Sequence, residues 1–243
     1  MADEHAQEKR RLERIAETFR TEHGFNGRLE HYRIRTVVEL VRGTRILEIG
    51  CAEGMLAAAL ADGRREVVAV DGSAALIAQA RERYTKPHLT FHQSLYEEFV
   101  PDAPFDTVVL VNILEHVDDP VDLLRKARFW TKQGGCIIIL VPTAWSLHRR
   151  IGAQMGFLAD VHDLNDTDRR VGHRRVYDHD LLEVDVAAAG LVTTRHIGLF
   201  LKPLSESQMN EWSDALIDAY YELGKELPEW CSELIVVAEF HGS

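Results

Sequence analysis

The sequence lacks any apolar run long enough to cross a membrane. A membrane helix needs about 20 consecutive apolar residues, whereas the longest run here, "CIIILVP" at 136–142, has the length of a buried strand. The amino-terminal segment "MADEHAQEKRRLERIAETF" is highly charged and contains no apolar core of the kind found in signal peptides. We therefore expect no membrane partner.

Cysteine and positive charge are also scarce. The three cysteines, Cys51, Cys136 and Cys231, lie far apart and show no paired spacing, which argues against a disulfide framework or a zinc motif. Buried, reduced thiols predict a cytoplasmic protein. Acidic residues outnumber basic ones by 39 to 28, for a formal net charge of −11. Proteins that bind phosphate backbones usually carry the opposite balance, so nucleic acid is not an expected partner.

Short apolar strands alternate with helices over the central part of the chain. We expect strands at 45–50, 66–71, 89–93, 105–112 and 134–142, with helices at 54–62, 73–84 and 119–131. This alternation is typical of parallel β-α-β units and predicts a doubly wound α/β sheet with helices on both faces. Apolar runs at 191–201 and 233–240 predict two further strands.

Other segments flank or interrupt this alternation. An exposed, charged helix is expected over 3–20 and a second helix over 27–41. No regular element is evident between 143 and 177, and long segments of this kind are often lids or binding loops. A helix with an apolar stripe is expected at 205–224. The stripe suits core packing or a homodimer face, so monomer and homodimer both remain open.

The turn that follows the first strand, "EIGCAEG", has the features of a ligand site. Ligands of open α/β sheets bind outside the carboxyl ends of the strands. Gly50 and Gly54 flank the turn, and small residues there allow the backbone to approach a ligand closely. Asp71 ends the next strand, where an acidic side chain can accept hydrogen bonds from both hydroxyls of a ribose.

The same turn distinguishes between two cofactor classes. The dinucleotide pattern G-x-G-x-x-G requires glycine at 52 and 55, but Ala52 and Met55 stand there. Glu53 opens the following helix, and its carboxylate would repel a pyrophosphate. S-adenosylmethionine has no phosphate and carries two cationic groups, so an acid such as Glu48 is compatible with it. We therefore expect S-adenosylmethionine, with an NAD(P)-dependent oxidoreductase as the weaker alternative.

Three segments resemble the motifs of class I S-adenosylmethionine-dependent methyltransferases. They are "ILEIGCAEGML", "VVAVDGS" and "VLVNILEHVDDP", the last of which is similar to the small-molecule branch. The resemblance covers about 43–142 well and "GHRRVYDHDLLEVDVAAAGL" more weakly. It implies a seven-stranded Rossmann-like sheet that ends in an antiparallel hairpin. It also implies amino-terminal helices over 1–42 that cover the cofactor, and a methyltransferase domain over 43–243.

The resemblance also implies which residues hold the cofactor. They are Glu48, Gly50, Ala52, Gly54, Asp71, Gly72, Ser94, Leu95 and Asn112. Ala52 replaces the usual middle glycine, and Ser94 stands where aspartate is frequent, although its hydroxyl could still meet the adenine amine. These departures keep a second hypothesis open, namely a non-catalytic binding protein that retains the fold.

Candidate acceptor residues follow the fourth strand and end the 143–177 segment. His116, near Asn112 and Glu115, suits a position beside the acceptor or a purely structural one. His173 could serve as a general base, and Arg174 and Arg175 could hold a carboxylate or phosphate on an anionic acceptor. The alternative for this stretch is a salt-bridged loop. Tyr177 belongs to the same stretch, and Tyr32 is expected to cap the pocket.

The sequence is less specific about the reaction. The acids and histidines between 160 and 168 match no metal-ligand spacing, so no metal site is expected. The fourth strand ends in "NILEH" rather than in the "NPPY" of enzymes that methylate amino groups. Methyl transfer to oxygen on a small-molecule acceptor is therefore favoured, and the acceptor itself is left open.

Overall fold

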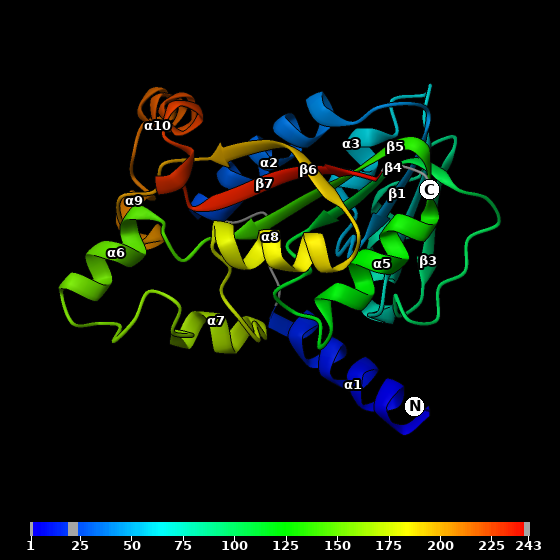
Figure 1. Cartoon of the computed structure of the whole chain (residues 1–243), viewed down its shortest axis with the longest axis horizontal. Coiled ribbons are helices and arrows are strands. Elements are labelled where there is room, and N and C mark those ends of the chain that lie inside the picture. The colour runs from blue at the N-terminus through cyan, green and yellow to red at the C-terminus, as the bar shows by residue number, and fades with distance from the viewer. Residues whose placement is uncertain (1, 19–23, 241–243) are drawn as a thin grey trace.

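One mixed sheet organises the chain. The computed structural model describes residues 2–18 and 24–240. Within them, seven strands follow the order β3-β2-β1-β4-β5-β7-β6 (Figure 1). The strands are β1 Arg45–Ile49, β2 Glu66–Asp71, β3 Leu89–Gln93, β4 Phe105–Val111, β5 Thr131–Pro142, β6 Val192–Leu199 and β7 Glu233–Glu239. Strands β1 to β5 are parallel, whereas β7 is antiparallel to both β5 and β6. The predicted sheet and its carboxy-terminal hairpin are confirmed.

Helices cover both faces of the sheet, as expected. One face packs against α2 Gly24–Leu40, α3 Met55–Leu60, α4 Ala74–Arg83 and α10 Asp214–Glu226, and the other against α5 Pro120–Trp130 and α8 His179–Ala188. Because successive strand residues point to opposite faces, Val109 belongs to the first core and Leu110 to the second. The sheet is therefore buried on both sides, and its edges are left for ligand binding.

Polar side chains begin several helices at one edge of the sheet. Ser73, Asp119 and Asp178 each accept a hydrogen bond from the backbone N–H three residues further on, which satisfies a donor that the helix leaves unpaired. Since β1 to β4 are parallel, their carboxyl ends meet at this same edge. The turns that follow these strands are thereby brought together.

The expected single helix over 205–224 is wrong. The structure has a short helix, α9 Glu206–Met209, a turn, and then α10. Arg28 of α2 donates hydrogen bonds to three backbone carbonyls of the turn, and Ser213 caps α10. The apolar stripe did not reveal this break, because an arginine from a distant helix stabilises the turn.

The segment between β5 and α8 is more ordered than the sequence suggested. It contains α6 Leu147–Gln154 and α7 Asp166–Val171. Arg149 is 6% exposed and donates to the Asp168 carboxylate at 2.9 Å and to two backbone carbonyls. This buried ion pair gives the segment a core of its own. Among the helices described, none combines the length and apolarity needed to span a membrane.

Candidate active site

A cavity opens at the carboxyl edge of β1 to β4. The space between its walls is about 910 Å³ when the open solvent at its mouth is included. Seven of the nine residues predicted to hold a cofactor line it, namely Gly50, Ala52, Asp71, Gly72, Ser94, Leu95 and Asn112. We call these seven residues the cofactor wall. Three separate sequence motifs therefore converge on one cavity.

Asp71 fixes the turn of the cofactor wall. Its carboxylate accepts hydrogen bonds from the backbone N–H groups of Ala52 at 3.0 Å and Ser73 at 2.8 Å. Ala52 has φ of 45°, a left-handed conformation that glycine adopts at lower cost. Burial raises the pKa of Asp71, while the two backbone hydrogen bonds lower it. Each carboxylate oxygen has a second lone pair, so Asp71 can still accept from ribose hydroxyls.

Two glycines of the cofactor wall have no room for a side chain. A Cβ atom on Gly50 would lie 2.8 Å from Ile113 Cδ1, and one on Gly72 would lie 2.4 Å from Leu12 Cδ1. No side chain larger than hydrogen therefore fits at either position without displacing a neighbour. Gly50 also has φ of 81°, a conformation that glycine adopts at low cost.

Glu48 and Gly54 lie behind the cavity rather than on its surface. Glu48 is 3% exposed and hydrogen-bonds the backbone of Ala57 in α3. Burial, with the nearby charges of Glu30 and Asp71, raises its pKa to about 8. Gly54 has φ of 80° and begins α3. Their predicted contact with the cofactor is corrected to an indirect role, because both position the turn from behind.

The two remaining polar side chains of the cofactor wall offer hydrogen-bond acceptors. The Asn112 Oδ1 atom is buried without a hydrogen-bond partner among the described residues. Ser94 Oγ donates to the Leu95 carbonyl at 2.9 Å, so its lone pairs stay available for a donor. Buried polar atoms usually have partners, and an unpaired acceptor on a cavity wall therefore points to a ligand that donates.

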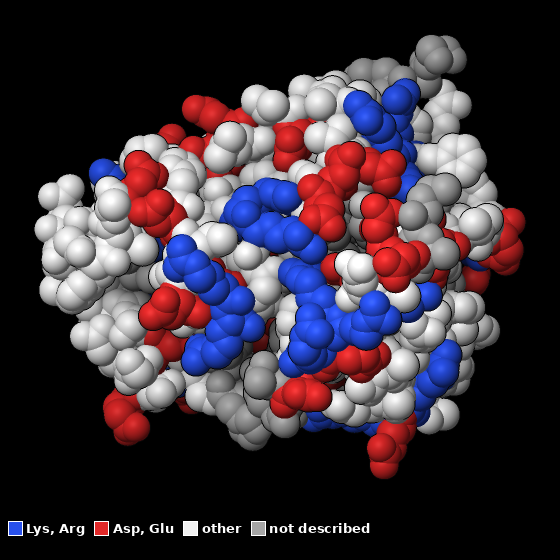
Figure 2. All heavy atoms as spheres, turned by 90° about the horizontal axis from the view of Figure 1, so that it is seen from below, with Lys and Arg blue, Asp and Glu red and all other residues white. Residues whose placement is uncertain are grey.

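Helix α1, Ala2–Thr18, lies along the mouth of the cavity. Glu8, Leu12 and Ile15 line the cavity. Glu13 accepts hydrogen bonds from Ser73 Oγ at 3.0 Å and from the backbone at the start of α4. The expectation of a fully exposed helix is wrong, because Ala16 is 5% exposed. Figure 2 shows the face that carries α1 and α7, where basic and acidic side chains are interleaved.

The two predicted tyrosines do not line the cavity. Tyr32 stacks on Tyr221 with ring centroids 4.4 Å apart and donates a hydrogen bond to Asp218. Tyr177 donates to Asp185 Oδ2 at 2.8 Å and is 2% exposed. The expectation that they bind substrate is corrected, because their rings are buried in the two cores that flank the sheet.

Arg174 and Arg175 have other partners than an acceptor anion. Arg175 donates to the backbone carbonyls of Leu114, Val117 and Asp118. Arg174 donates to the His116 carbonyl at 2.8 Å and pairs with acidic side chains. Because both guanidinium groups hold the loop after β4, the predicted binding of an anionic acceptor loses its basis.

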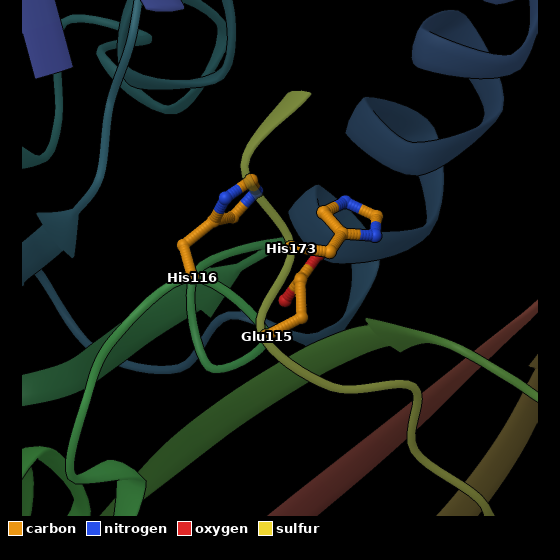
Figure 3. Close-up of side chains that lie close together, drawn as sticks. All are labelled: Glu115, His116 and His173. Carbon is orange, nitrogen blue, oxygen red and sulfur yellow. The ribbon is translucent and has the colours of Figure 1, made fainter. Parts of the chain in front are cut away.

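The structure brings both predicted histidines together. His116 lines the cavity, and its ring centroid lies 4.8 Å from that of His173 (Figure 3). Burial, together with the neighbouring His173, lowers the pKa of His116 to about 3. The imidazole of His116 is therefore neutral at physiological pH. His173 Nδ1 lies 3.2 Å from Asp168 Oδ1, which orients its ring.

Glu115 completes this group and had no role in the sequence analysis. It is 1% exposed, and neither carboxylate oxygen has a hydrogen-bond partner among the residues described. Burial raises its pKa to about 7. We call Glu115, His116 and His173 the histidine cluster. The only signal in the sequence was an acid three residues after the expected strand 105–112. The sequence did not show that His173, far along the chain, lies beside it.

The geometry defines a class of protein. An open α/β sheet presents a glycine-flanked turn and, at the end of the next strand, an acid that can accept hydrogen bonds from a ribose. A group of proton-accepting side chains adjoins the same cavity. This arrangement suits a nucleoside-type cofactor and a second reactant beside it.

Comparisons with known proteins identify the family. The family model described as a methyltransferase domain matches residues 9–196. The chain therefore belongs to the class I S-adenosylmethionine-dependent methyltransferases, whose cofactor is S-adenosylmethionine, and not to the nicotinamide-dependent oxidoreductases. A solved S-adenosylmethionine-dependent methyltransferase from Mesorhizobium loti shares the fold, with a TM-score of 0.63 at 20% identity, covering 88% of this chain and 99% of that one.

Two curated relatives match this chain over part of their own length. A ubiquinone biosynthesis O-methyltransferase from Rhodopseudomonas palustris is 29% identical over 169 residues, which are 68% of this chain and 64% of that protein. A probable S-adenosylmethionine-dependent methyltransferase from Mycobacterium tuberculosis is 29% identical over 174 residues, 72% and 58% of the two chains. The match thus spans less than two thirds of either relative.

Proposed function

We propose that the protein transfers a methyl group from S-adenosylmethionine to an oxygen atom of a small-molecule acceptor. One observation carries the proposal: Asp71 and His116 line the same cavity. An acid suited to a ribose thus borders the same cavity as an unprotonated imidazole that can accept a hydrogen bond.

The cofactor wall fits S-adenosylmethionine, which supplies an electrophilic methyl group on a sulfonium. Asp71 would accept the ribose hydroxyls, and the Ser94 hydroxyl would accept from the adenine amine. Asn112 Oδ1, a buried acceptor without a partner among the described residues, would take a proton of the cofactor's ammonium group.

Helix α1 would close the site. Leu12 and Ile15 turn apolar side chains toward the cavity, and exclusion of water strengthens polar interactions inside it. Of the two helices expected to cover the cofactor, we assign the covering role to α1 alone, because the residues found to line the cavity include none from α2.

The histidine cluster favours an oxygen acceptor. A hydroxyl must lose its proton as its oxygen is methylated, and an unprotonated imidazole can accept a hydrogen bond from that hydroxyl and orient its oxygen. An amine already offers a lone pair once it is neutral, so it has less need of such a group. His116, at the cavity wall, is the residue we place against the acceptor, with His173 behind it. One similar protein is named as an O-methyltransferase, which agrees with this choice.

A screen of acceptors tests the proposal. Purified protein is incubated with S-adenosylmethionine and candidate hydroxyl compounds, amines and thiols, and S-adenosylhomocysteine release is measured. Release that depends on a hydroxyl compound is expected. If the cofactor binds but no acceptor of any class leads to release of S-adenosylhomocysteine, the result favours a non-catalytic binding protein.

A further inference from the structure

We propose that the histidine cluster is a binding site for a divalent transition-metal ion. Glu115, His116 and His173 each offer one ligand atom, and these atoms all lie within 4.8 Å of one another. Figure 3 shows the Glu115 carboxylate below and between the two imidazoles. Ligands around one tetrahedral ion at about 2.1 Å lie about 3.4 Å apart. A movement of roughly an ångström or less by each ligand atom would therefore bring the three onto one ion.

Glu115 is the strongest sign that a cation belongs here. It is 1% exposed, and both of its oxygens are without hydrogen-bond partners in the described part of the chain. An unpaired polar group in the interior costs free energy. The nearby Arg33 does not relieve it, because its guanidinium is held by Glu233 and Glu30. A metal ion would satisfy both oxygens.

The two histidines are held as metal ligands usually are. Such histidines commonly bond a carboxylate or backbone carbonyl through the ring nitrogen that does not bind the metal. His173 has Asp168 at 3.2 Å from Nδ1, and Asp168 is held by Arg149 at 2.9 Å. His116 hydrogen-bonds the backbone of Gly172. Each ring therefore has a partner in the protein that helps to fix its orientation.

The ligand set selects the kind of ion. Two imidazoles and one carboxylate suit Zn²⁺, Mn²⁺, Fe²⁺ or Co²⁺. Mg²⁺ and Ca²⁺ prefer a shell made wholly of oxygen. Three protein ligands leave coordination positions open, as in catalytic sites. His116 borders the cavity, so an open position can face the acceptor.

The role of the ion rests on the proposed function, whereas its binding does not. An acceptor hydroxyl that coordinates the ion loses its proton more readily. The proton leaves to solvent, and the oxygen uses its freed lone pair for the bond to the methyl carbon. The electron pair of the broken carbon–sulfur bond stays on sulfur. The histidine cluster would then position the acceptor oxygen as well as activate it.

A second group of possible ligands provides a control. His179, Glu183 and His196 also lie within 4.8 Å of one another. There Glu183 already accepts hydrogen bonds from Thr193 and His196. This group lies at the surface, and its carboxylate already has hydrogen-bond partners, so we expect no tight metal binding there.

Cobalt titration tests the site directly. Full-length protein is stripped with a chelator and titrated with Co²⁺, with visible absorption and calorimetry as readouts. One tight site per chain is expected. Glu115→Gln and His173→Asn should each weaken it by at least about tenfold, the effect known for residues that support metal ligands. His196→Asn should leave the tight site unchanged.

Titration of the same samples with S-adenosylhomocysteine separates the possible outcomes. Unchanged affinity shows that a variant is folded, and if Glu115→Gln fails to fold, His173→Asn decides. The proposal is overturned if the wild type binds no Co²⁺ tightly, or if binding survives Glu115→Gln and is lost in His196→Asn. Cobalt binding without S-adenosylhomocysteine binding would retain the metal site and reject the methyltransferase function.

Discussion

The cofactor wall and the histidine cluster adjoin one cavity but are built in different ways. The cofactor wall consists of strand ends and the turns after them, held by backbone hydrogen bonds to Asp71. The histidine cluster joins Glu115 and His116 to His173, which follows α7 in the chain. His173 contacts Asp168, and Asp168 is paired with the buried Arg149. The first is local and motif-like, whereas the second depends on how a long insertion folds.

Their chemistry differs as well. The cofactor wall is lined by small residues and offers hydrogen-bond acceptors, which suits a ligand rich in donors. The histidine cluster concentrates buried titratable groups, which is typical of sites that handle protons or metal ions. We therefore expect the two to separate by mutation: one set of variants should change cofactor binding, and the other should change transfer alone.

His116→Asn should have the largest effect. Loss of the imidazole removes the group placed against the acceptor, and such groups contribute about 10²- to 10⁴-fold to rates. Methyl transfer should fall by that factor in the acceptor assay, with S-adenosylhomocysteine affinity unchanged. His148→Asn is the matched control, since His148 of α6 is half-buried like His116 and is not among the residues that line the cavity. An equal loss in both variants would contradict a specific role.

Asp71→Ala should weaken ligand binding at the cofactor wall. Loss of charge-assisted hydrogen bonds to the ribose should weaken S-adenosylhomocysteine binding by about 1–3 kcal/mol, as measured by calorimetry. Asp102→Ala serves for comparison, because Asp102 is exposed and precedes β4 at the opposite edge of the sheet. Unchanged affinity in Asp71→Ala would remove this residue from the ribose role.

Glu48→Gln should show how protonation of the buried Glu48 carboxyl changes the stability of the fold with pH. A folded-state pKa of about 8 lies above the ordinary glutamate pKa of 4.5, so the protonated form is favoured in the fold. The stability this provides is complete below about pH 4.5 and is lost as pH rises through 8. Between pH 7 and 9 the wild type should lose about 1 kcal/mol relative to Glu48→Gln.

Urea unfolding at each pH measures this difference. Glu39→Gln, at an exposed position of α2, should follow the wild type. If the unfolding free energies of the wild type and Glu48→Gln change with pH in the same way, Glu48 ionises normally in the fold and the prediction is contradicted.

Glu13→Ala should have the smallest effect. It removes the hydrogen bonds that dock α1 on the start of α4, worth about 0.5–1.5 kcal/mol each. S-adenosylhomocysteine should then dissociate faster by about two- to tenfold in a stopped-flow experiment. Glu17→Ala, on an exposed position of the same helix, should not change the rate. Equal rates in all three proteins would mean that α1 does not cover the ligand.

The sequence predicted the cofactor wall far better than the histidine cluster. Strand alternation and the motifs around Gly50 and Asp71 are short-range patterns, and the structure keeps their order. The structure gives Tyr32, Arg174 and Arg175 other partners than a substrate: Tyr32 hydrogen-bonds Asp218, and the two arginines bond backbone carbonyls. No local pattern could show that His173 lies against Glu115, since their contact depends on a fold that an interior ion pair stabilises.

Calorimetric titration of the wild-type protein with S-adenosylhomocysteine tests the central claim most directly. We predict saturable binding to one site per chain at micromolar concentrations, and no binding of NAD⁺ under the same conditions. Absence of heat at tens of micromolar S-adenosylhomocysteine, or saturable binding of NAD⁺ in its place, would contradict the assignment of this cavity to S-adenosylmethionine.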